Sequence, residues 1–179
     1  MRIRFRASSL LQLFAVAFVT TFVANAAADQ PVQLRVLSYN IHHGAGVDGK
    51  LDLNRIARVI LSADPHIVAL QEVYLRVLRS QSIDQPAELA RLTDMQVVFG
   101  GNIPLQGGQY GNAVLSTFPI VSHQNHLLPS IDNGEQRGVV VAEISVPHAS
   151  KPLVLFATHF DHRSDDTERF ASAESINAL

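Results

Sequence analysis

The sequence contains no cysteine among its 179 residues. This absence excludes disulfide bonds, thiolate nucleophiles and the cysteine-based zinc and iron–sulfur sites. The fold must therefore be held together by its core alone, and any metal site must be built from oxygen and imidazole ligands.

The sequence also lacks an apolar run that reaches the roughly 20 residues of a bilayer-spanning helix. The longest candidate, residues 10–23, follows three arginines and precedes Ala24-Asn25-Ala26, a pattern that a signal peptidase accepts. We therefore expect residues 1–28 to be a signal peptide, the alternative being an uncleaved membrane anchor. Residues 29–179 are then one domain of a secreted or periplasmic protein that has no stable membrane anchor.

Basic residues are few, since 14 Lys and Arg face 16 Asp and Glu and give a formal charge of −2. Removing a leader with three arginines and no acidic residue takes this charge to −5. Nonspecific binding to nucleic acid depends on Lys and Arg at the phosphates, so the composition gives no general argument for such a partner. A local basic patch would reverse that expectation.

Short β-rich runs alternate with helical patterns, which predicts an α/β fold with a mixed sheet and flanking helices. Helices are expected after the capping residue Asp52, near Pro86, and from Asp165, which lies three residues before Glu168 as in a capping box. The apolar run Ile67–Leu70 has no alternation, so it predicts a strand buried on both faces. The expected strands are 34–39, 67–70, 96–99, 112–118, 137–146 and 153–158.

Polar residues that apolar packing does not require follow three of these strands, at Asn40, Glu72 and His159. Strand ends are common places for functional groups because a rigid scaffold meets a loop there. Glu72 must reach solvent, pair with a base or bind a cation, since an unpaired buried charge is costly. Taken singly, each residue is explained equally well by solvent exposure or a local hydrogen bond, and so are the histidines at 42, 43 and 162. The recurrence after three strands favours a site.

Four motifs follow one another along the chain. They are Leu37-Ser38-Tyr39-Asn40-Ile41, Ile67-Val68-Ala69-Leu70-Gln71-Glu72-Val73, Gly111-Asn112-Ala113-Val114-Leu115-Ser116 and Thr158-His159-Phe160-Asp161. Their order resembles the endonuclease/exonuclease/phosphatase superfamily, over residues 34 to about 170. This superfamily includes deoxyribonuclease I-like nucleases, abasic-site endonucleases, neutral sphingomyelinases and inositol polyphosphate phosphatases. The resemblance implies part of a four-layer α/β sandwich, with the active site where the loops of two sheets meet.

The resemblance implies a metal-dependent phosphoesterase that hydrolyses phosphate mono- or diesters. Asn40 and Glu72 would help to hold Mg²⁺ or Mn²⁺, which suits hard cations that prefer oxygen ligands. His159 would contact the scissile phosphate, and Asp161 would orient that imidazole or a water molecule. The substrate class stays open among nucleic acid, phospholipid and sugar phosphate.

Three further residues are candidates for substrate binding. Arg137 resembles a family arginine that leads into a strand beside the site, where a guanidinium would grip phosphate oxygens. An ion pair with Glu135 or Glu143 at a strand edge explains it equally well. Tyr110 and Asn112 flank a glycine just before an expected strand, so they either line the substrate cleft or form a turn.

The superfamily pattern continues with a Gly-Asp-x-Asn segment and a Ser-Asp-His segment, which supply the water-activating aspartate and a His–Asp pair. The sequence ends before both, so we expect residues 29–179 to be a C-terminally incomplete domain with exposed apolar sheet faces. The alternatives to an enzyme are a noncatalytic relative that binds a phosphorylated ligand and a fragment without function.

Overall fold

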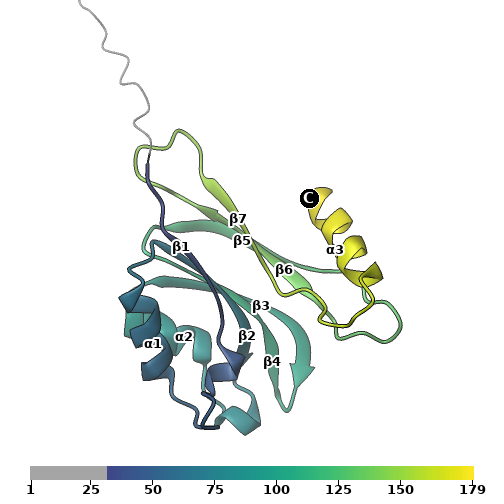
Figure 1. Cartoon of the computed structure of the whole chain (residues 1–179). Helices are drawn as coiled ribbons and strands as arrows, with labels where there is room; N and C mark the ends of the chain where they lie inside the picture. The colour runs from purple at the N-terminus through teal and green to yellow at the C-terminus, as the bar shows by residue number, and fades with distance from the viewer. Residues whose placement is uncertain (1–31) are drawn as a thin grey trace, which may run out of the picture.

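The computed structural model describes residues 32–179, so the expected signal peptide at 1–28 lies outside the described residues. No helix formed by the described part of the chain is long and apolar enough to cross a membrane. Two β-sheets stack against each other, and helices cover the outer face of the first (Figure 1). The expected α/β fold with a mixed sheet and flanking helices is confirmed.

The first sheet has four strands in the order β1-β2-β4-β3. The first two, β1 and β2, are parallel, and the remaining pairs are antiparallel, so this sheet is mixed as expected. A parallel pair needs a crossover connection, which here contains a helix. The strands are β1 (Val36–Asn40), β2 (Ile67–Leu75), β3 (Gln96–Leu105) and β4 (Gly108–Ser116).

The second sheet is antiparallel, in the order β5-β6-β7 (Ile120–Leu127, Gly138–Ile144 and Leu153–Thr158). Strand β7 has the expected bounds, whereas β5 was not expected from the sequence. Its centre is a polar run from Ser122 to His126 that lacks apolar alternation. Pairing along β6 makes this run a strand, because the ladder satisfies its backbone whatever its side chains are.

The outer face of the first sheet carries α1 (Leu53–Ser62) and α2 (Gln85–Thr93). As expected, Asp52 caps α1 by accepting a hydrogen bond from the Arg55 backbone N–H at 2.9 Å. Asp84 caps α2, which has Pro86 in its first turn. Two short 3₁₀ helices, η1 (His42–Gly44) and η2 (Leu78–Ser80), follow β1 and β2.

Strand β2 is buried on both faces, as its continuous apolar run predicts. Val68 and Leu70 pack with Ile56, Ile60 and other residues of the helices. The alternate residues of β2, Ile67 and Ala69, pack against the second sheet through a core that contains Val140, Ala142, Ile144 and Ala157. Since β2 is central to both cores, its C-terminal end is held firmly in place.

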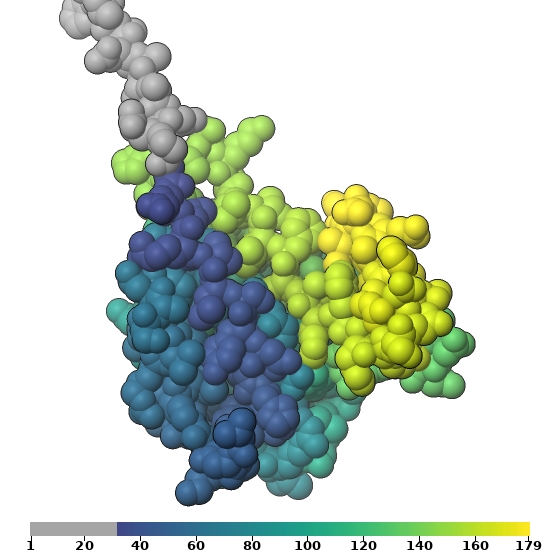
Figure 2. Space-filling view, in the orientation of Figure 1, coloured from purple at the N-terminus to yellow at the C-terminus, as the bar shows by residue number. Residues whose placement is uncertain are grey.

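The last helix, α3 (Thr167–Asn177), projects to the side of the second sheet (Figures 1 and 2). The expected capping box is wrong. Asp165 accepts from the Thr167 backbone N–H at 2.8 Å, but Glu168 turns away to accept from the Ile131 backbone N–H and from Arg163, each at 2.7 Å. The buried Glu168 carboxylate therefore ties α3 to the loop before β6.

Candidate active site

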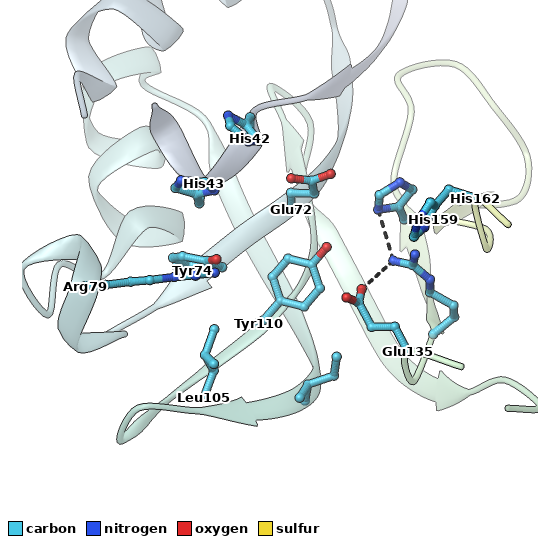
Figure 3. A pocket seen from close by; sticks show the side chains of 12 residues that line it. His42, His43, Glu72, Tyr74, Arg79, Leu105, Tyr110, Glu135, His159 and His162 are labelled. Carbon is cyan, nitrogen blue, oxygen red and sulfur yellow. Dashed lines mark hydrogen bonds and ion pairs between the residues drawn. The ribbon is translucent and has the colours of Figure 1, made fainter. Parts of the chain in front are cut away.

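A cleft of about 660 Å³ opens where loops of the two sheets meet (Figure 3). Its first-sheet wall includes His42, His43, Glu72, Tyr74 and Tyr110. Its second-sheet wall includes Glu135, Arg137, His159 and His162. The resemblance predicted a site in this place, and most of the candidate residues line it or contact a residue that does.

Glu72 reaches the cleft because β2 bulges there. The pairing of β2 with β4 shifts register between Leu70 and Val73, and Glu72 has a left-handed backbone with φ of 58°. A bulge redirects a side chain that a regular strand would place on one of its two faces. The carboxylate is therefore carried out of the packed strand and into the cleft, half-buried.

Asn40 joins the end of β1 to this carboxylate. Its Nδ2 donates to Glu72 Oε1 at 2.7 Å, while its Oδ1 accepts from the His42 backbone N–H at 2.9 Å. An amide oxygen has two lone pairs, so Oδ1 keeps one for a cation. A carboxylate and an amide oxygen in contact fit a hard divalent ion such as Mg²⁺, which completes its shell with water and substrate oxygens.

Arg137 is 3% exposed and is part of the second-sheet wall of the cleft. Its Nη1 donates to Glu135 Oε1 at 2.6 Å and lies 3.4 Å from His159 Nδ1. Of the two explanations left open by the sequence, the structure contains the ion pair with Glu135 and also places the guanidinium in the cleft. Glu135 thus joins the site as a residue that sequence reasoning treated only as an ion-pair partner.

His159 is a neutral hydrogen-bond donor at this position. Burial and the neighbouring Arg137 lower its pKa from the ordinary value of 6.5, so the ring is uncharged at pH 7. A guanidinium only donates, so Nδ1 accepts from Arg137 and the ring proton lies on Nε2. The half-buried ring therefore offers one N–H group to a ligand.

Among the described residues, Asp161 does not contact the His159 ring, which was one of the two roles expected of it. The residue is 6% exposed, and its carboxylate accepts from Arg163 Nε at 2.7 Å, a hydrogen bond that lowers the pKa of the carboxyl group. Within residues 32–179 the partner of the His159 ring is Arg137, so Asp161 neither orients the imidazole nor lines the cleft. Through Arg163 it belongs to the buried network that contains Glu168.

Tyr110 and Asn112 have different positions, although only one residue separates them. Tyr110 lines the cleft, where burial, Glu135 and Glu72 raise its pKa to about 12, so its hydroxyl keeps its proton at neutral pH. Asn112 is 1% exposed and its Nδ2 donates to the Gly138 carbonyl at 3.0 Å. That hydrogen bond connects the two sheets, and Asn112 does not line the cleft.

His42 and His43 of η1 lie closer to Glu72 than the sequence indicated. Potential ligand atoms of His42, His43 and Glu72 all lie within 4.8 Å of one another. The sequence placed both histidines in a Gly-rich loop and gave no reason to separate them from surface residues. The one sequence feature that indicated their position was that they come just after the first expected strand.

A sequence profile of the Endonuclease/Exonuclease/phosphatase family matches residues 37–172. The chain is also 28% identical over 160 residues to YbhP of Escherichia coli K12, a protein described as uncharacterised. The match covers 84% of the chain and 63% of YbhP, so the chain spans less than two thirds of that relative's length.

Solved structures show the same fold. An endonuclease/exonuclease/phosphatase from Beutenbergia cavernae has a TM-score of 0.66 and 29% identity, over 81% of this chain and 42% of that one. The human Nocturnin catalytic domain, solved with a bound sulfate anion, has a TM-score of 0.59 and 21% identity, over 80% and 56% of the two chains. Glu72, Arg137 and His159 all lie inside the region that the profile matches.

Proposed function

Because the chain belongs to the endonuclease/exonuclease/phosphatase family, we propose that its cleft hydrolyses phosphate mono- or diesters with the help of a divalent cation. One observation carries this proposal. Glu72 offers a carboxylate on one wall of the cleft, and Arg137 and His159 offer hydrogen-bond donors on the other. A phosphate ester in this cleft would contact the divalent cation on the carboxylate wall and the hydrogen-bond donors on the opposite wall, so it needs both.

Glu72 and Asn40 are the residues that would hold Mg²⁺ or Mn²⁺. Their hydrogen bond of 2.7 Å fixes the carboxylate before any ion arrives, so little side-chain freedom is lost on binding. When bound, the ion supplies a Lewis acid that polarises the phosphoryl oxygen and stabilises charge on the leaving group.

The second-sheet wall binds and orients the phosphate. Arg137, held in place by Glu135, presents its guanidinium to the non-bridging oxygens. The Nε2–H of neutral His159 donates to the oxygen on which negative charge develops as water attacks in line. The protonated hydroxyl of Tyr110 offers a further donor. We also propose that the enzyme acts outside the cytoplasm, as residues 1–28 predict, and we leave nucleic acid, phospholipid and sugar phosphate as its substrate classes.

The test compares metal binding with turnover in matched variants. Mg²⁺ and Mn²⁺ binding is measured by titration calorimetry, and hydrolysis with bis-p-nitrophenyl phosphate and p-nitrophenyl phosphate, with EDTA as the metal-free control. Glu72→Gln should abolish Mg²⁺-stimulated hydrolysis and weaken Mg²⁺ binding by at least about tenfold, since it removes a charged ligand. Glu143→Gln, an exposed change on β6 outside the cleft, should leave both unchanged.

Two outcomes would contradict the proposal. A folded Glu72→Gln protein that keeps Mg²⁺-stimulated activity would show that the metal assignment is wrong. Binding of Mg²⁺ and inorganic phosphate without any turnover would favour the noncatalytic phosphate-binding relative. Circular dichroism on each variant checks that the fold is retained.

A further inference from the structure

The proposed reaction leaves two imidazoles beside Glu72 without a role. His42 and His43 belong to η1 and lie next to Glu72 on the same wall of the cleft (Figure 3). One potential ligand atom from each of these side chains lies within 4.8 Å of the other two. Three potential ligand atoms this close together can reach a single ion after small side-chain adjustments.

The backbone at all three positions is unusual. His42, His43 and Glu72 have left-handed φ values of 45°, 48° and 58°. Residues with a Cβ seldom adopt this conformation, and such residues gather at functional sites, where the surrounding structure holds them in place. Here the left-handed residues come from two separate segments, the turn after β1 and the bulge of β2, and their side chains converge.

Two side-chain amides hold these segments together. Asn40 binds the His42 backbone N–H at 2.9 Å and Glu72 Oε1 at 2.7 Å. Gln85, which is fully buried, donates to the His43 carbonyl at 2.7 Å and accepts from the Tyr74 backbone N–H at 2.9 Å. The turn that carries the histidines is therefore tied to β2 at Glu72 and at Tyr74.

The rings themselves are also positioned. The His43 ring stacks on Tyr74 with centroids 5.0 Å apart and planes 12° from parallel. The His42 ring lies 4.4 Å from the His43 ring at 50°. His43 is half-buried and His42 is exposed, so the cluster is fixed on its protein side and open to water on the other.

We propose that His42, His43 and Glu72 form a binding site for a first-row divalent metal of the Zn²⁺ class. Imidazole nitrogen suits Zn²⁺, Co²⁺ and Ni²⁺, whereas Mg²⁺ prefers oxygen ligands throughout its shell. Three protein ligands with the remaining positions open to water is the arrangement of exchangeable and catalytic zinc sites. The site goes beyond the proposed hydrolysis and shares only Glu72 with it, so a zinc-class ion and Mg²⁺ compete for one carboxylate.

The test measures Zn²⁺ binding to the purified chain by titration calorimetry, and Co²⁺ binding by the visible absorption that follows its coordination. The informative variants are His42→Asn and His43→Asn, because asparagine tolerates a left-handed backbone and removes the imidazole. His148→Asn is the matched control, since His148 has φ of 65° and is exposed in the turn between β6 and β7.

Each variant of the η1 histidines should weaken Zn²⁺ binding by at least about tenfold and reduce the Co²⁺ absorption, since losing a direct ligand costs at least as much as losing its hydrogen-bonding partner. His148→Asn should change neither signal. Unaltered Zn²⁺ affinity in both His42→Asn and His43→Asn, or no Zn²⁺ binding by the parent chain, would overturn the proposal.

Mg²⁺ titration of the same variants separates this site from the proposed enzyme. Glu72→Gln should weaken the binding of both ions, while the two histidine variants should weaken Zn²⁺ binding more than Mg²⁺ binding. If Mg²⁺-dependent hydrolysis fails and this pattern of Zn²⁺ binding persists, the zinc-class site stands and the proposed function does not. An equal loss of affinity for Zn²⁺ and Mg²⁺ in the histidine variants would contradict a separate zinc-class site.

Discussion

The two sheets differ in how their faces are covered. The first sheet packs against α1 and α2 on one face and against the second sheet on the other. Within residues 32–179, the second sheet packs on its inner face, while on its outer face the β7 residues Val154 and Phe156 are 47% and 41% exposed. Loss of apolar contacts should therefore destabilise the protein mainly through the first sheet.

The sheets differ in chemistry as well. The first-sheet wall of the cleft carries the carboxylate of Glu72, at a bulge with a left-handed backbone. The second-sheet wall carries Arg137 and His159, which lie at the ends of regular strands. Loops of both sheets contain left-handed residues, but Glu72 has this backbone inside a strand, and that strand is packed on both faces and so is able to hold it in place.

The largest expected effect comes from making the same Leu→Ala substitution in each sheet, which tests the difference in packing. Leu70 on β2 is fully buried, whereas Leu127 on β5 is 58% exposed. Leu70→Ala should lower the free energy of unfolding by about 2–5 kcal/mol, because it leaves a cavity in the first core. Leu127→Ala should change it by less than about 0.5 kcal/mol. Urea denaturation followed by circular dichroism measures both, and similar losses would contradict the difference in packing between these two positions.

An intermediate effect tests whether the second-sheet wall binds anions. Arg137→Gln should weaken inorganic phosphate binding in EDTA by about 10- to 100-fold, since hydrogen bonds to a charged partner contribute roughly 1.5–3 kcal/mol. Titration calorimetry measures the affinity, and Arg91→Gln, an exposed change on α2, is the matched control.

Glu72→Gln should not weaken phosphate binding under the same metal-free conditions, because removing a negative charge from the cleft lowers repulsion of the anion. Unchanged phosphate affinity in Arg137→Gln, with a loss of stability, would make Arg137 a structural ion-pair residue and would remove the contrast between the walls.

The fold could be predicted where the local pattern and the tertiary environment agree. The run Ile67–Leu70 predicts a doubly buried strand because both faces of β2 meet apolar neighbours. The end of that strand was missed, since β2 continues through the bulge to Leu75 and polar residues interrupt the pattern there. Strand β5 was missed because its polar residues owe their conformation to backbone pairing with β6.

The site could be predicted only in part, for a related reason. Asn40 ends β1, Arg137 precedes β6 and His159 follows β7, and these strand ends were recognisable in the sequence. Glu72 was recognised as well, although it lies inside β2 at the bulge. Which polar groups contact one another was not, because these contacts join distant parts of the chain. Arg137 rather than Asp161 faces the His159 ring, and Asn112 bonds across the sheets to Gly138.

The smallest expected effect concerns the proton affinity of His159, which reports how closely the second-sheet wall is packed. Burial first and Arg137 second lower its pKa below 6.5, so the folded protein binds this proton more weakly than the unfolded chain does. The stability contributed by the neutral ring is therefore complete above pH 6.5 and is lost as the pH falls through the lower folded pKa.

In metal-free protein, ¹H–¹⁵N NMR should show a titration midpoint below 6.5 and the Nε2–H tautomer at neutral pH. Arg137→Gln should raise that midpoint only part of the way, because burial is the larger cause and remains. A midpoint at or above 6.5 in the parent chain would mean that the ring faces water, and the second-sheet wall would then lose its neutral donor.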